Sequence, residues 1–117
     1  MTDALAKRIR NYLSSPDSPD VPITYQMLTI AMDLVPPNTI HRVTVALEYL
    51  IEQDADAGQP LIATFVISKA RDGLPASGFF YCAQRVGRFH GDPEGVDAEP
   101  FYAAEFERAR AFWRPDT

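Results

Sequence analysis

Cysteine and histidine are the side chains of this chain whose types could do chemistry, and their spacing does not favour it. The 117 residues include one cysteine, Cys82, and two histidines, His41 and His90. A nucleophilic cysteine acts as a thiolate beside an activating base, and the sequence places no histidine next to Cys82. The histidines are far apart, and neither lies in an HxH or HExxH pattern. We therefore expect no catalytic residue, no metal site and no cofactor, and a buried structural role for Cys82.

The other residue types that carry chemistry are dispersed as well. The six glycines are scattered, and none forms a phosphate-binding loop after a strand. The acidic residues of segment 92–99 do not have the spacing of a calcium-binding EF-hand loop. No serine lies in a nucleophile-elbow sequence. These patterns predict a non-enzymatic protein whose acidic segment is a solvated loop.

The basic residues are better placed for binding than for catalysis. Residues 57–91 have a net charge of +3 and residues 92–117 a net charge of −4, in a chain whose formal charge is −5. Affinity for nucleic acid comes largely from phosphate neutralisation, so the whole-chain charge argues against a nucleic-acid partner and the local charge argues for one. A mixed solvated surface would give the same pattern, so both alternatives stay open.

The length of the chain predicts one domain over residues 1–117. Within it we expect an N-terminal helix and proline-rich loop (1–20), a core (21–90), and an acidic loop with a C-terminal helix (91–117). No apolar run approaches the roughly 20 residues that span a membrane, so we expect no membrane partner. Charges interrupt the apolar residues of the N-terminus, which is typical of an amphipathic helix and predicts a cytoplasmic protein.

Two helices are predicted in the core. Thr24 is the expected cap of the first, and Pro36 and Pro37 end it. Asn38 is the expected cap of the second, which stops near Gly58. The expected buried side chains recur at helical spacing; they are Leu28, Ala31, Met32 and Val35 in the first helix and Ile40, Val43, Leu47, Leu50 and Ile51 in the second.

A β-hairpin is predicted to follow these helices. Residues 61–68 form an apolar run typical of a buried strand, Asp72-Gly73 is a strong turn dipeptide, and residues 79–86 are the expected return strand. The predicted fold class is α+β: a winged helix-turn-helix with a β-hairpin wing and an additional aromatic-rich C-terminal helix over about residues 100–112.

This order of elements resembles the C-terminal DNA-binding domain of the alkylguanine-DNA alkyltransferases and the alkyltransferase-like proteins. The resemblance covers roughly residues 21–80 and rests on residues 23–28, 35–38, 41–47 and 62–67 and on the turn at 72–74. It implies a winged helix-turn-helix that binds double-stranded DNA. Most of the matched positions are apolar, and winged helices in general share several of them.

The sequence departs from that family at the reactive positions. With the wing turns aligned, residues 63–65 (Ala-Thr-Phe) occupy the place of the family's Cys-His-Arg, and none of them accepts an alkyl group. Cys82 lies after the turn instead of before it. His41 stands at the family's intercalating arginine, with Arg42 beside it. The resemblance therefore implies DNA binding without alkyl transfer.

Two functions follow as hypotheses. The first is a small nucleic-acid-binding protein with a regulatory or accessory role, in which the second core helix enters a groove and the wing holds the backbone. Its expected contact residues are Thr39, His41, Arg42, Lys69, Arg71 and Arg85. The second is a protein–protein interaction module, an adaptor or inhibitor, that uses the acidic C-terminal segment and its aromatic helix. Both a monomer and a homodimer are compatible with the sequence.

Overall fold

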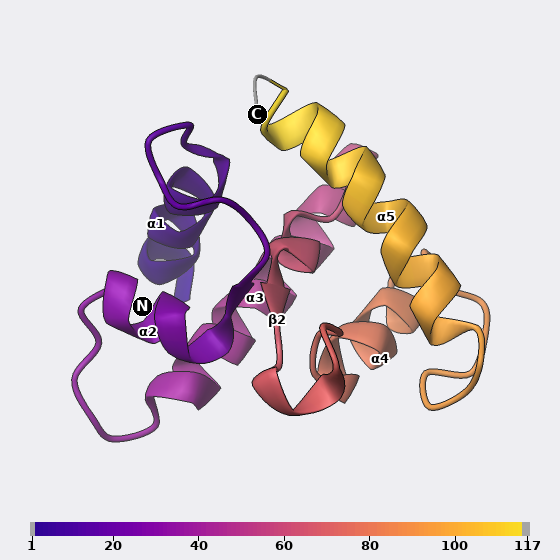
Figure 1. The fold of residues 1–117 in the computed structure, drawn as a ribbon, viewed down its shortest axis with the longest axis horizontal. Helices are drawn as coiled ribbons and strands as arrows, with labels where there is room; N and C mark the ends of the chain where they lie inside the picture. The colour runs from indigo at the N-terminus through magenta and orange to yellow at the C-terminus, as the bar shows by residue number, and fades with distance from the viewer. Residues whose placement is uncertain (1, 116–117) are drawn as a thin grey trace.

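The computed structural model describes residues 2–115, and helices make up most of that part of the chain (Figure 1). The α-helices are α1 (Thr2–Ser14), α2 (Tyr25–Ala31), α3 (Thr39–Ala57), α4 (Ser77–Arg85) and α5 (Ala98–Trp113). Two 3₁₀ helices, η1 (Ile62–Phe65) and η2 (Lys69–Arg71), and two short strands, β1 (Ile23–Thr24) and β2 (Val66–Ile67), lie between them. The structure is therefore a helical α+β body with a minimal sheet.

Helix α3 is the central element of the fold. It contacts α1, α2, α4 and η1, while α5 packs against η1 from the other side (Figure 1). Val43, Leu47 and Leu50 recur at helical spacing and are all buried, as the sequence predicts. The helix ends at Gly58, whose φ of 69° is the left-handed conformation that glycine adopts without strain. The helix spans the predicted residues, but Asn38, its expected cap, makes no side-chain capping hydrogen bond, and Ile40, expected to be buried, is 41% exposed.

The predicted β-hairpin wing is wrong. Strand β1 pairs with β2 in parallel, with Ile23 opposite Val66, and the predicted return strand lies within α4. The physical reason is visible in which side chains are buried: Phe79, Phe80, Cys82 and Ala83 face the core, while Tyr81, Gln84 and Arg85 are exposed. That is a helical period, and an apolar run this short does not separate helix from strand by composition.

The expected strand over residues 61–68 is also shorter than predicted. Residues 62–65 form the 3₁₀ helix η1, and only Val66 and Ile67 pair as a strand. Every residue from Leu61 to Val66 is buried, so the run is apolar because it crosses the core and not because it lies in a sheet. The turn at Asp72 and Gly73 is present, with φ values of 53° and 85°, but it leads into α4.

Helix α2 ends earlier than the prolines predict. Asp33 takes a left-handed φ of 57°, its N–H donates to the Ile30 carbonyl, and the Leu34 N–H donates to the Thr29 carbonyl at 3.1 Å. This bond pattern is the Schellman motif, which closes a helix and turns the chain away. Val35 therefore leaves the predicted buried stripe and is 73% exposed. The predicted cap at the other end is confirmed, because the Thr24 hydroxyl accepts from the Met27 N–H at 3.1 Å.

Two buried carboxylates hold η1 in place. The Asp54 carboxylate accepts from the Ile62 N–H at 3.0 Å and pairs with Arg10 at 2.9 Å. The Glu105 carboxylate accepts from the Leu61 N–H at 2.9 Å and pairs with Arg88 and Arg108. Neither acid exposes more than 1% of its surface. Burial raises the pKa of Asp54, against the opposing effects of the Ile62 N–H and the Arg10 charge. These acids join α3 and α5 to the same turn.

The proline-rich loop after α1 is held by the end of α5. Arg114 donates to the backbone carbonyls of Leu13, Ser18 and Pro19, and Arg110 pairs with Asp20 at 3.0 Å. Figure 1 shows this loop beside the last turn of α5. The loop after α1 is thereby fastened to the end of α5.

Candidate functional site

Exposed apolar side chains gather on one part of the sequence. Among the described residues, eight large hydrophobic side chains are exposed, and five of them lie on α2, on the connector after it, or on the first half of α3. We call these five the α2–α3 patch; they are Met27, Ile30, Val35, Ile40 and Val45, with exposed fractions from 37% to 73%. These five residues lie close together in the sequence, and exposed apolar side chains that gather in this way mark binding sites more often than single ones do.

The α2–α3 patch lies in a segment that carries almost no charge. Residues 21–47 contain one acid, Asp33, and one base, Arg42, so this stretch is neutral in a chain of net charge −5. Arg42 donates to the Val35 carbonyl at 3.2 Å and so joins the connector to α3. The segment that contains the helix assigned to a DNA groove is therefore mostly apolar and has no net charge.

The predicted contact residues come from three elements. Thr39, His41 and Arg42 lie in the first turn of α3, where Thr39 is half-buried and the other two are exposed. Lys69 and Arg71 lie in η2, and Arg85 lies at the end of α4. They do not share one helix and one hairpin, because the predicted return strand is helical.

Three of the predicted cations already have partners within the chain. Arg42 binds the Val35 carbonyl, Arg71 donates to the Ser77 hydroxyl and lies 6.0 Å from the Phe80 ring centroid, and Arg85 pairs with Glu52 at 2.9 Å. Lys69 and His41 form no hydrogen bond or ion pair with the described residues. These two remain the side chains most available to an anionic ligand.

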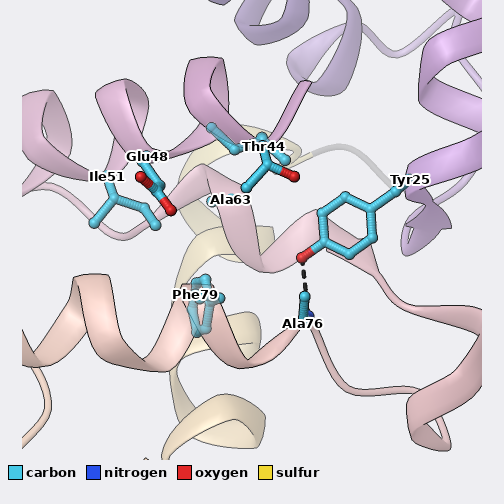
Figure 2. Close-up of a pocket in the computed structure, with 9 residues that line it drawn as sticks. Tyr25, Thr44, Glu48, Ile51, Ala63, Ala76 and Phe79 are labelled. Carbon is cyan, nitrogen blue, oxygen red and sulfur yellow. Dashed lines mark hydrogen bonds between the residues drawn. The ribbon is translucent and has the colours of Figure 1, made fainter. Parts of the chain in front are cut away.

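A small cavity lies between α3 and α4, under Tyr25 (Figure 2). Its volume is about 60 Å³. Most of its wall is apolar, and its polar side chains are Tyr25, Thr44 and Glu48. Figure 2 shows Thr44 and Glu48 projecting from α3 toward α4, with Tyr25 approaching from the other side. The Tyr25 hydroxyl accepts from the Ala76 N–H at 3.0 Å, which fixes the ring over the start of α4.

The titratable groups at this cavity are not set up for catalysis. Burial raises the pKa of the Tyr25 phenol, and the nearby Glu48 charge raises it further, so the phenol stays protonated at neutral pH. Burial also raises the pKa of the neighbouring Cys82 thiol to about 11. A thiol or phenol is activated as a nucleophile when its pKa is lowered. The cavity is therefore better suited to binding than to covalent chemistry.

The described residues offer no metal centre and no membrane-crossing helix. No group of three or more His, Cys, Asp or Glu side chains in residues 2–115 is arranged to hold a metal ion. Among the helices of that range, none combines the length and the apolar character that crossing a bilayer needs.

Comparison with known proteins adds no relative. No family model matches the sequence, and neither the curated proteins nor the solved structures give a match. The resemblance to the alkyltransferase DNA-binding domain thus rests on the residues alone.

Sequence reasoning missed the features that distinguish this site. Met27 and Ile30 are ordinary apolar members of a helix, and only the direction in which α2 packs exposes them. Glu48 is one acid among many on α3 until α4 is placed beside it. A signal was present in the low charge of residues 21–47, because an apolar and uncharged stretch is unusual for a solvated surface.

Proposed function

We propose that this protein is a non-enzymatic protein–protein interaction module, that its docking surface is the α2–α3 patch, and that the occupant of the patch is a second copy of the chain. The observation that carries the proposal is the concentration of five of the eight exposed large hydrophobic side chains in one neutral segment. Interface cores are depleted of charge, and homodimer interfaces are more apolar than other protein surfaces.

Charge favours a second copy as the occupant. The chain has a net charge of −5, so two copies repel each other over most of their surface. The neutral segment 21–47 is where two copies meet without opposing carboxylates. A basic partner would instead be drawn to the acidic C-terminal segment.

The C-terminal helix is a weaker docking surface than its aromatic content predicts. Phe101, Tyr102 and Phe106 pack in the aromatic cluster around Phe65 and Phe79. Trp113 donates its ring N–H to the Pro60 carbonyl at 2.9 Å. Phe112 is the aromatic residue of α5 that stays exposed. These side chains are part of the core, so α2 and α3 offer the better docking surface.

Sedimentation velocity across low to high micromolar concentrations tests the proposal. The wild-type chain is expected to shift from monomer to dimer, and Ile30→Glu to remain monomeric, because Ile30 is 67% exposed on the patch and a buried unpaired carboxylate opposes association. Val96→Glu is the matched control, since Val96 is 89% exposed outside the patch. A wild-type monomer at every concentration, or equal effects of the two variants, would contradict the proposal.

Nucleic-acid binding is the second candidate. The order of α2 and α3, with exposed His41 and Arg42 in the first turn of α3 and an unpaired Lys69 in η2, favours it. Affinity for duplex DNA should then fall steeply as salt rises, and Lys69→Ala should weaken binding while Lys7→Ala, an exposed lysine of α1, should not. Absence of binding at low salt would remove this candidate.

A further inference from the structure

The cavity between α3 and α4 contains a carboxylate that forms no hydrogen bond or ion pair with the other described residues, although its charge acts on Arg85. Asp54 and Glu105 each accept a backbone N–H and pair with arginine. The Glu48 carboxylate, on the wall of the cavity, forms no hydrogen bond or ion pair with the described residues, although it is half-buried. A carboxylate in apolar surroundings has few water partners and interacts strongly with a cation.

The start of α4 supports the negative charge of Glu48. A Cβ atom on Gly78, the second residue of α4, would lie 3.5 Å from the Glu48 carboxylate oxygen Oε2. The carboxylate therefore lies at the N-terminal end of a helix, where the helix dipole stabilises an anion. Because Glu48 already occupies that end, the cavity does not suit an anionic ligand.

The remaining polar group on α3 extends the same acceptor surface. Thr44 is one helical turn before Glu48 and so lies on the same face. Its hydroxyl donates to the Ile40 carbonyl at 3.0 Å, which leaves its lone pairs available as acceptors. The rest of the wall includes Leu47, Ile51 and Phe79. Acceptors on one side and methyl and ring groups on the other suit a ligand with both N–H donors and methylenes.

The volume of the cavity sets the size of that ligand. A cavity of about 150 Å³ holds benzene, with six heavy atoms. The present cavity of about 60 Å³ therefore holds about two or three heavy atoms. A primary ammonium carries three donors and no acceptor, and it matches a carboxylate and a hydroxyl without leaving a group unpaired.

We propose that this cavity binds a primary alkylammonium group, with the nitrogen at Glu48 and Thr44 and one or two methylenes against Leu47, Ile51 and Phe79. The ligand is held by a charge-assisted hydrogen bond and by apolar contact. This inference does not depend on the α2–α3 patch, which lies on different side chains.

Amide chemical shifts in the ¹⁵N-labelled protein test the inference with ethylammonium as the probe. The Ala76, Gly78 and Thr44 amides should shift as ethylammonium is added. A ligand with three heavy atoms binds no tighter than about millimolar, so the titration extends well above that range. Ethanol, with the same number of heavy atoms and no charge, should shift these amides far less. Equal responses to the two probes, or none to ethylammonium, would overturn the inference.

Two variants and one control make the test specific. Glu48→Gln should weaken ethylammonium binding about tenfold, because a charge-assisted hydrogen bond becomes a neutral one. Gly78→Ala should weaken it by filling the cavity; Gly78 lies within α4, where alanine is tolerated, so the fold should be kept. Glu107→Gln, an exposed acid of α5, should leave binding unchanged. Unchanged binding in both cavity variants would also overturn the inference.

The same ammonium chemistry is found in free amines and in lysine side chains. Titration with Nα-acetyl-lysine amide separates these two sources. Tighter binding of ethylammonium assigns the cavity to a small free amine, and tighter binding of the lysine derivative assigns it to a lysine side chain. Either result supports an alkylammonium site, provided that Glu48→Gln weakens it.

Discussion

The two halves of α3 differ in whether their side chains are buried and paired or exposed and unpaired. In the second half, Asp54 is completely buried, and its carboxylate pairs with Arg10 of α1 and accepts from the Ile62 N–H of η1. The first half exposes Ile40 and Val45, and Glu48 at its end forms no side-chain hydrogen bond or ion pair with the described residues, although its charge acts on Arg85. The helical period is the same in both halves, so the difference comes from the neighbouring elements. Satisfied groups hold the fold together, and unsatisfied ones show where something else can bind.

The largest loss of stability is expected at Asp54, in the second half of α3. Asp54→Ala leaves the Ile62 N–H without its acceptor and Arg10 without its charge partner, so we expect the free energy of unfolding to fall by about 3 kcal/mol. Asp54→Asn should lose less, since its amide oxygen can still accept from Ile62. Urea denaturation measures both. Asp56→Ala, an exposed acid of the same helix, is the control and should change stability by less than about 0.5 kcal/mol. Equal losses of stability for Asp54→Ala and Asp56→Ala would contradict the structural role assigned to Asp54.

The stability of the protein at alkaline pH tests how well the contact between α3 and α4 shields the Cys82 thiol. Burial raises the pKa of the Cys82 thiol from 9.0 to about 11. Between these pH values the unfolded chain releases the thiol proton while the folded chain keeps it. The free energy of unfolding therefore falls as pH rises, by about 2 kcal/mol in total.

Cys82→Ala removes this contribution. Urea denaturation of both proteins from pH 9 to pH 11 should show the wild type losing stability faster than the variant. Other groups that titrate in the range cancel in the difference. Parallel curves would mean that the thiol is not shielded by α3, and would contradict the packing described.

Four of the five α-helices could be predicted from the sequence because their signals are local. The stripe through Val43, Leu47 and Leu50 and the stop at Gly58 depend on neighbours within a few residues. The strand predicted over residues 79–86 is wrong because eight residues with six apolar members fit both a helix and a strand. Only the packing of Phe79 and Phe80 against the core decides between them.

The groups that distinguish the two halves of α3 could not be predicted. Glu105 accepts from the Leu61 N–H across 44 residues of sequence, and nothing local to either residue indicates the pair. Glu48 and Asp54 are both acids on one helix, and their different surroundings come from α1, α4 and η1. Charge density was the one local signal of the docking surface, through the neutral stretch 21–47.

A smaller effect is expected at the start of α2. Thr24→Ala removes the hydroxyl that accepts from the Met27 N–H, so we expect a loss of about 1 kcal/mol in the free energy of unfolding. Thr24→Ser should retain most of the stability because it keeps the acceptor. Thermal denaturation of the three proteins measures this, and equal losses for alanine and serine would show that the methyl group, not the cap, matters.

The smallest effect is expected at Glu48. Its carboxylate has no hydrogen bond or ion pair to lose, only the weaker interactions with the start of α4 and with Arg85, so Glu48→Ala should lower the free energy of unfolding by about 0.5 kcal/mol. The contrast with Asp54→Ala, six positions along the same helix, is the core of the comparison. A loss at Glu48 as large as the loss at Asp54 would assign Glu48 to the fold and not to a binding site.

We propose that α2 and the first half of α3 form a docking surface for a second copy of the chain. Amide chemical shifts recorded from low to high micromolar concentration test it most directly. We expect the amide chemical shifts of residues 27–45 to change with protein concentration, and those of α4 and of the residues around Asp54 to stay constant. Shifts that stay constant everywhere, or that change only outside residues 27–45, would contradict it.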